Sequence, residues 1–161
     1  VFVQEQQSDS ASFYLDRVLR LKPDDPGYLQ QQPRLKLAEL YRSQGKARQA
    51  LRYYLQEAEA NPPDLWLIGD IAVLCEEVGE VSQALQWRQR LLAVQGGGTV
   101  DQRATLVSMV ELQVKAGDTK AALATLTQLA QIDTLNRYGY YSRYVQVAEK
   151  GGDQAARLKG L

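Results

Sequence analysis

The segment that decides the fold is residues 35–58, which read LKLAELYRSQGKARQALRYYLQEA and return 34 residues later, at 69–92, as GDIAVLCEEVGEVSQALQWRQRLL. In each copy a glycine precedes an alanine by five residues, and the same step recurs twice toward the C-terminus. The four pairs are Gly45–Ala50, Gly79–Ala84, Gly117–Ala122 and Gly151–Ala156. A period of this length predicts helical units that bury their apolar faces only by stacking on their neighbours.

The residues around each glycine predict two helices joined by a tight turn. Leu37, Ala38 and Tyr41 have the i, i+1, i+4 spacing that lines one face of a helix. Glycine suits the turn because it accepts a positive φ, and the alanine allows the second helix to approach the first closely. Pro62 and Pro63 are expected to end one second helix and to stand in the first turn of the next.

The expected helices form a half pair and four full pairs. Asp118, Ser8 or Ser10, and the Thr99–Gln102 pair are the expected N-terminal caps. GGGT at 96–99 lengthens one step of the period and is interpreted as a linker, not as a phosphate cradle. The first predicted helix ends at about Leu21. The other predicted helices cover 28–44, 46–60, 64–78, 80–94, 100–116, 118–131, 134–149 and 153–159.

This pattern resembles the tetratricopeptide repeat family. The best copy carries the family's residues at Leu37, Ala38, Tyr41, Gly45, Ala50, Tyr54 and Pro62. The copies also depart from the pattern, because Arg34 and Ile68 stand where tryptophan is usual and Gln113 replaces an aromatic residue. In the last copy, aligned on Gly151, Arg143 replaces an aliphatic residue. The resemblance covers nearly the whole chain and is strongest at 33–92.

The resemblance implies an all-α fold, a right-handed superhelical solenoid of antiparallel helix pairs. Residues 1–161 are expected to form a single domain of about four repeats. The expected units are a half repeat at 8–23 and repeats at about 28–62, 63–97, 99–133 and 134–161.

Composition disfavours several classes of function. The chain of 161 residues carries 19 basic and 19 acidic side chains, so it lacks the excess of positive charge typical of nucleic-acid binding. It contains no histidine, the commonest general base and metal ligand, and no catalytic or zinc-spacing motif. We therefore predict that it is not an enzyme and has no cofactor or metal. Cys75 is interpreted as a small core residue.

The sequence does not identify the cellular compartment of the protein. One cysteine leaves the redox environment open, and no apolar run is long enough to span a bilayer, so no membrane insertion of this fragment is expected. The start at Val1 suggests a piece of a larger protein. Localisation is unknown from sequence, and the bacterial periplasm is favoured over the cytoplasm by the style of the repeats.

The resemblance also implies where a partner binds, since first helices line the concave face in this family. When the first helices are aligned, this face carries acidic residues, and two of the helices add aromatic residues. Such a face suits a protein partner with basic residues and an apolar anchor. The candidate partner-binding residues are Trp66, Asp70, Glu76, Glu77, Glu111, Tyr138 and Tyr141. The lysines and arginines of a clamp for acidic chaperone tails are missing.

Each candidate has a structural alternative. Trp66 could instead cover the junction with the preceding helix, and the carboxylates could form a solvated face. Tyr140 and Tyr144, spaced i, i+4, are expected in the core, whereas Tyr138 and Tyr141 are the better candidates for an exposed patch.

Three functions follow from these residues. The first is a protein–protein interaction scaffold, similar in style to repeat arrays of bacterial exopolysaccharide secretion and biofilm formation. The second is direct polysaccharide binding, with Trp66, Tyr138 and Tyr141 stacking on sugar rings. The third is a structural spacer or self-association module.

Overall fold

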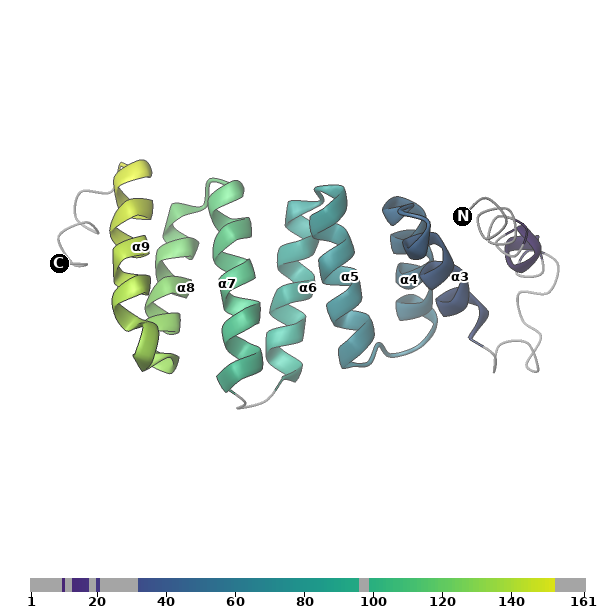
Figure 1. Cartoon of the computed structure of the whole chain (residues 1–161), viewed down its shortest axis with the longest axis horizontal. Helices are drawn as coiled ribbons and strands as arrows, with labels where there is room; N and C mark the ends of the chain where they lie inside the picture. The colour runs from purple at the N-terminus through teal and green to yellow at the C-terminus, as the bar shows by residue number, and fades with distance from the viewer. Residues whose placement is uncertain (1–9, 11–12, 18–19, 21–31, 96–98, 153–161) are drawn as a thin grey trace. The chain divides into compact units, whose positions relative to one another are not determined.

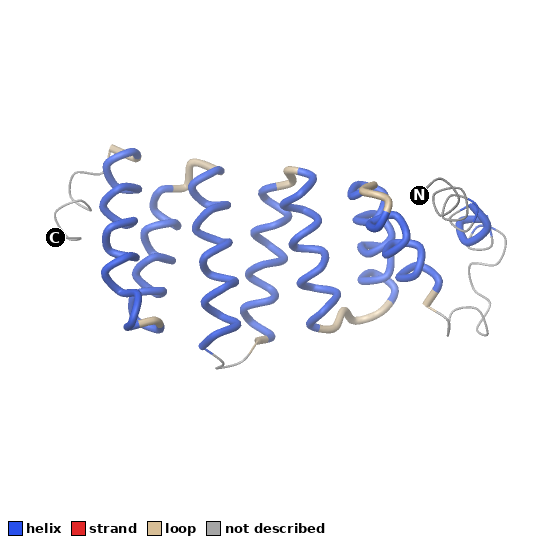
Figure 2. The backbone as a smooth tube through the Cα atoms, in the orientation of Figure 1, coloured by secondary structure: helices blue, strands red, loops and turns tan. Residues whose placement is uncertain are grey.

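The computed structural model describes residues 10, 13–17, 20, 32–95 and 99–152, without the side chains of 99–101. Every regular element in this part of the chain is a helix (Figure 2). The chain divides into two compact units, Val1–Gly79 and Glu80–Leu161. The all-α prediction is confirmed. The handedness of a superhelix, the single domain and the repeat boundaries stay predictions.

The first unit contains three long helices, α3 (Pro33–Ser43), α4 (Ala47–Ala60) and α5 (Leu65–Val78). Helix α4 packs against both α3 and α5 (Figure 1). Residues 13–17 are also helical and reach α4, because the Tyr53 hydroxyl donates a hydrogen bond to the Asp16 carboxylate.

The second unit contains α6 (Val81–Val94), α7 (Thr99–Lys115), α8 (Thr119–Ile132), a short 3₁₀ helix η1 (Thr134–Asn136) and α9 (Arg137–Lys150). Along the chain, α6 packs on α7, α7 on α8 and α8 on α9 (Figure 1). The predicted bounds of α4 to α8 differ from the observed ones by at most one residue. The predictions for 8–9, 21–23, 28–31, 96–98, Ala156 and 153–159 lie outside the described residues, as does the side chain of Thr99.

The core of each unit includes the positions that the repeat pattern marks. Ala50, Ala84 and Ala122, one in each of three second helices, are fully buried. In the described part of the first unit the fully buried side chains include Pro33, Leu37, Ala38, Ala50, Ile71, Ala72, Leu74 and Cys75. In the second unit a cluster from three helices comprises Leu106, Met109, Val110, Ala122, Leu123, Leu126, Leu129, Val147 and Ala148.

The turns show why glycine recurs. Gly45 has φ +70°, and its amide donates to the Arg42 carbonyl while the Lys46 amide donates to the Tyr41 carbonyl, both at 2.9 Å. This pair of bonds satisfies carbonyls that the end of a helix leaves without partners. Gly117, with φ +76°, repeats the arrangement.

The last copy corrects the predicted register by one residue. Gly152, not Gly151, has the positive φ (+72°), and its amide donates to the Glu149 carbonyl at the same i−3 offset as at Gly45. Gly151 has another role, because a Cβ built on it would come within 2.5 Å of Thr119 Cγ2. Counted from Gly152, the position of the aliphatic residue belongs to Tyr144, so Arg143 replaces nothing apolar.

Helix starts show a second correction. Pro62 and Pro63 lie in the loop before α5 and not in its first turn, because Asp64 is the N-cap and accepts a 2.8 Å hydrogen bond from the Leu67 amide. The predicted cap at Asp118 is confirmed by a 3.0 Å bond from the Ala121 amide. Each cap satisfies one backbone donor that a helix start leaves free.

The position of the missing tryptophan holds a charge pair. Arg34 Nη1 lies 3.6 Å from Glu57 Oε2, and the side chain of Glu57 is 9% exposed. Asn61 Nδ2 also donates to Glu57 Oε1, at 2.6 Å. The corresponding residues of the third copy are Leu106 and Leu129, which pack in one core cluster. An ion pair therefore replaces an apolar contact in the first full copy.

Candidate functional site

The first-helix face of the first unit is held by an ion pair between neighbouring first helices. Arg42 Nη1 on α3 donates to Asp70 Oδ1 on α5 at 2.7 Å, and both side chains are 39% exposed. The hydrogen bond from Arg42 to Asp70 raises the pKa of the Arg42 guanidinium, which also interacts with the Tyr54 hydroxyl. Burial raises the pKa of Tyr54. Asp70 is therefore already paired with a cation inside the molecule.

Trp66 and Glu77 share a stripe with Asp70 along α5. At about 100° per residue, positions spaced by four and seven residues fall on one side of a helix. The Trp66 side chain is 82% exposed, so it does not cover the junction with the preceding helix. Glu77 is also exposed, whereas Glu76 is half-buried and lies about 100° around the helix from Glu77. The structure thus brings Trp66, Asp70 and Glu77 together and leaves Glu76 apart.

The second unit has a longer, weaker ion pair between its first helices. Arg143 Nη2 on α9 lies 3.8 Å from Glu111 Oε1 on α7, and both side chains are substantially exposed. Arg143 precedes its turn glycine, Gly152, by nine residues, as Asp70 precedes Gly79. The candidate carboxylates Asp70 and Glu111 are therefore both paired with an arginine from an adjacent first helix.

Tyr138 and Tyr141 are exposed, at 87% and 40%, as predicted, but they lie on another side of α9 from Arg143. Helical geometry places them about 140° and 160° around the helix from Arg143. The structure therefore does not bring them to the face that Arg143 shares with Glu111. Tyr140 and Tyr144 pack, half-buried, against the core cluster, as expected.

Sequence reasoning missed the polar node at Asp133. Its carboxylate accepts hydrogen bonds from Asn136 Nδ2 (2.9 Å), the Tyr140 hydroxyl (2.9 Å) and Arg103 Nη1 (3.3 Å). The bonds from Asn136, Tyr140 and Arg103 lower the pKa of Asp133 to about 2. This node joins α7, the end of α8 and the start of α9. The sequence signal was Asp133 three residues before Asn136, a local capping spacing.

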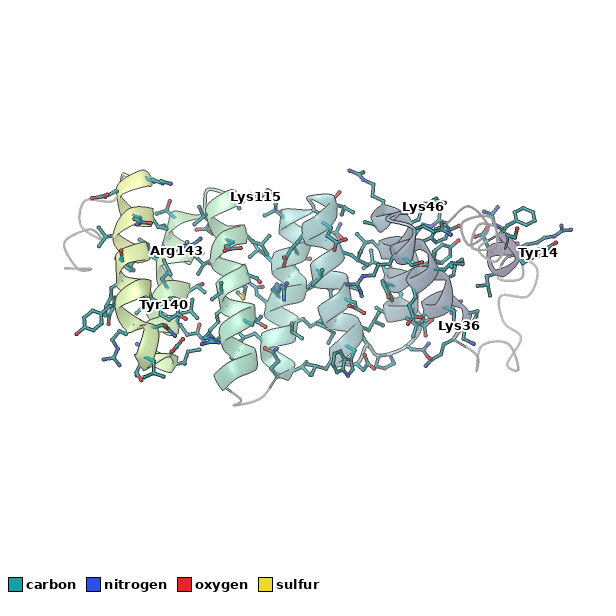
Figure 3. The ribbon with its side chains drawn as sticks, viewed as in Figure 1. Tyr14, Lys36, Lys46, Lys115, Tyr140 and Arg143 are labelled. Atoms are coloured by element: carbon teal, nitrogen blue, oxygen red, sulfur yellow. The ribbon has the colours of Figure 1, made fainter. Side chains whose placement is uncertain are left out.

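A recess of about 520 Å³ lies at the C-terminal end of α9, beside the turn between α7 and α8. It was not predicted from sequence, because its residues come from three helices. Figure 3 labels Arg143 on α9 and Lys115 at the end of α7. The recess is lined by Val114, Gly117, Thr119, Arg143, Gln146, Val147, Lys150 and Gly151.

Among the described residues, no three acidic, cysteine or histidine side chains cluster in a way that could hold a metal ion. Nor does any helix there combine the length and apolar character that crossing a membrane requires. Cys75 is fully buried, in agreement with its interpretation as a core residue.

Comparison with known proteins identifies the architecture. Residues 35–65 match the tetratricopeptide repeat family model. A crystal structure of MamA aligns over 98% of this chain and 86% of its own, with a TM-score of 0.63 and 15% identity. The fold is that of a tetratricopeptide repeat array.

A second structure supports the same fold. YrrB, described as a tetratricopeptide repeat protein with an unusual peptide-binding site, aligns over 98% of this chain and 76% of its own, with a TM-score of 0.65 and 11% identity. No curated protein sequence matches the chain. At these identities the likeness establishes the tetratricopeptide array and nothing further about its partners.

Proposed function

We propose that this tetratricopeptide array is a non-catalytic scaffold that binds a partner protein on its first-helix face. The observation that carries the proposal is Trp66, which is 82% exposed on the stripe of α5 that Asp70 and Glu77 share. An exposed tryptophan beside charges is typical of an interface centre, since its ring supplies a large contact area at low entropic cost. The similar fold of YrrB, whose description includes a peptide-binding site, agrees with this use.

The partner chemistry at the first unit is basic with an apolar anchor. Its first helices carry the carboxylates Glu39, Asp70, Glu76 and Glu77 against the cations Lys36 and Arg42 on the predicted face. Because Arg42 already neutralises Asp70, the charge left to steer a partner comes chiefly from Glu39 and Glu77, which are exposed. We keep Glu76, Glu111, Tyr138 and Tyr141 as proposed contact residues from the sequence pattern alone.

The test is capture of proteins from a lysate of the source organism, followed by mass spectrometry. We compare the chain with Trp66→Ala and with Phe13→Ala, which removes an exposed aromatic ring that belongs to no proposed contact. We expect Trp66→Ala to lose a protein that Phe13→Ala retains. The purified partner should then bind about 30-fold more weakly to Trp66→Ala, the loss typical of a tryptophan at an interface centre. Equal binding by both variants and the unmodified chain would overturn the proposal.

Self-association is a second candidate because α9 and η1 present large apolar side chains to solvent. Leu135 and Tyr138 are almost completely exposed, and Tyr141 adds a partly exposed ring. Large apolar side chains that gather on an exposed surface are typical of an interaction site. Sedimentation of the chain against Tyr138→Ala at increasing concentration distinguishes this role, since only a self-associating chain gains mass.

The biological process in which the chain takes part is also a proposal. A role in bacterial exopolysaccharide secretion and biofilm formation rests on the style of the repeats, and direct polysaccharide binding rests on exposed aromatic rings such as Trp66. Tryptophan fluorescence with and without neutral oligosaccharides tests the latter. A signal that saturates with sugar and does not change with salt would favour polysaccharide binding over a charged protein interface.

A further inference from the structure

The recess at the end of α9 has a charge character opposite to that of the first unit's face. Arg143 and Lys150 contribute two cations to its lining, and none of the lining residues that the structure describes is a carboxylate. Lys115, in the last turn of α7, follows the lining residue Val114 in sequence but does not itself line the recess. The recess is therefore suited to an anionic group.

The cations of the recess are only weakly neutralised within the chain. Among the described residues, the ion-pair partner of Arg143 is Glu111, at 3.8 Å, with side chains 47% and 61% exposed. A pair this long and this exposed contributes little, typically ~0–1 kcal/mol. Among the described residues, no carboxylate lies within salt-bridge distance of Lys150.

The ends of helices explain only part of this charge. Lys115 and Lys150 lie in the last turns of α7 and α9, where a cation interacts favourably with the helix dipole. Arg143 is in the middle of α9, about two turns earlier, where that effect has decayed. The helix dipole therefore does not account for the position of Arg143.

The recess also has an apolar side. Val114 is 41% exposed, whereas Val147, at 8%, belongs mainly to the core, and Thr119 and Gln146 supply a hydroxyl and an amide. An aliphatic side chain beside an acidic one matches this combination, because contact with Val114 removes apolar surface from water as Arg143 and Lys150 bind the carboxylate. A free phosphate or a nucleic-acid backbone would leave Val114 unused.

We infer that this recess binds an acidic side chain and an adjacent aliphatic side chain from a segment of a partner protein. The inference rests on the proposed scaffold function and names the partner chemistry at the second unit. It also means that a partner contacting both units would carry basic residues for one unit and acidic residues for the other.

The first experiment titrates the isotopically labelled chain with blocked peptides and follows amide NMR signals. The probe is Ac-Glu-Leu-Glu-Leu-NH₂, and the controls are the Gln-Leu and Lys-Leu peptides of the same length. We expect the acidic peptide alone to shift the amides of Gly117, Thr119, Gln146 and Lys150, with less shift as salt rises. Binding of the glutamine peptide with equal affinity, or shifts confined to other residues, would overturn the inference.

Variants around the recess should change its affinity for the acidic peptide in both directions. Arg143→Gln and Lys150→Gln should each weaken the acidic peptide about tenfold, the effect of losing a charge-assisted hydrogen bond. Glu111→Gln should strengthen binding about twofold, because it removes the competing carboxylate from Arg143. Arg48→Gln, at an exposed arginine on α4, makes the same charge change in the other unit and should leave the affinity unchanged.

The two proposals fail separately. If Trp66→Ala loses a captured partner but the acidic peptide binds no better than its glutamine counterpart, the scaffold stands and the acidic recess is wrong. If the acidic peptide binds at the recess and Trp66→Ala retains every captured protein, the recess stands as a binding site and the Trp66 face is wrong.

Discussion

Arg34 and Glu57 form a nearly buried ion pair at positions where the third copy of the repeat holds Leu106 and Leu129. Removing one partner leaves a charge without compensation in a poorly solvated place. Replacing both by apolar residues of similar size removes the cost of desolvating two charges, which the attraction between them rarely exceeds.

We therefore expect Glu57→Leu alone to lower the free energy of unfolding by about 1–3 kcal/mol, less than for a fully buried pair because Arg34 retains partial exposure. The double variant Arg34→Leu, Glu57→Leu should equal or exceed the unmodified chain. Urea denaturation of both single variants and the double variant measures the coupling. If the double variant instead lost as much free energy of unfolding as the two single variants together, apolar residues could not take the place of this ion pair.

Gly151→Ala tests the close approach of α9 to the start of α8. The new methyl group would overlap Thr119 Cγ2 and Oγ1, at 2.5 and 2.6 Å, and overpacking of this kind costs ~1–3 kcal/mol. Adding Thr119→Ala removes both atoms and should recover most of the loss. At Gly152, next in sequence, no described atom lies within 4 Å of a Cβ, so Gly152→Ala should lose ~1–2 kcal/mol, through its positive φ, with no rescue by Thr119→Ala. Thermal unfolding of the four variants distinguishes the two effects.

Gln113 is a site for stabilisation. Its side chain is 6% exposed, and its Oε1 is buried with no hydrogen-bond partner among the described residues. Because an unsatisfied buried acceptor is costly, Gln113→Leu should raise the free energy of unfolding by about 1 kcal/mol. Gln128→Leu, the same change at an exposed position of α8, should alter it by less than about 0.5 kcal/mol. A loss of stability in Gln113→Leu would mean that the amide is satisfied in solution.

The node at Asp133 predicts a specific loss of stability in acid. Because the pKa of Asp133 is lowered from 3.8 to about 2 in the folded chain, its stabilising effect is complete above pH 4 and is lost as the pH falls toward 2. Asp133→Asn cannot titrate and should show a smaller fall in melting temperature across this range. Glu77→Gln, which removes an exposed carboxylate, is the control and should follow the unmodified chain. Identical acid profiles for all three would contradict the assignment.

The fold could be predicted from sequence because its signals are local and repeated. Gly45, Gly79 and Gly117 have the positive φ that the pattern required, and the alanines five residues later are buried. The prediction failed by one residue at Gly151, since two adjacent glycines serve different needs and spacing alone does not separate a turn from a close contact. The contact with Thr119 distinguishes Gly151 from Gly152, and that contact joins residues far apart in sequence.

The candidate surface was less predictable for a related reason. Exposure of Trp66, Tyr138 and Tyr141 follows from helical periodicity, but the pairing of Asp70 with Arg42 depends on a contact between two helices, with 28 residues separating the two side chains in sequence. Residue type marked Asp70 and Glu111 as free acidic contacts, whereas geometry gives each an arginine neighbour. The same geometry assembles the basic recess from residues that no motif connects.

Within each unit, every long helix packs against the helix that follows it along the chain, through connections of only a few residues. Such contacts require little loop closure before they form, so folding can start at any helix pair and spread to its neighbours. Amide exchange should then reveal separate opening events, with the α3–α4 and α7–α8 pairs closing on their own timescales. An array built in this way can release one pair of helices to a partner while the rest keeps its native structure.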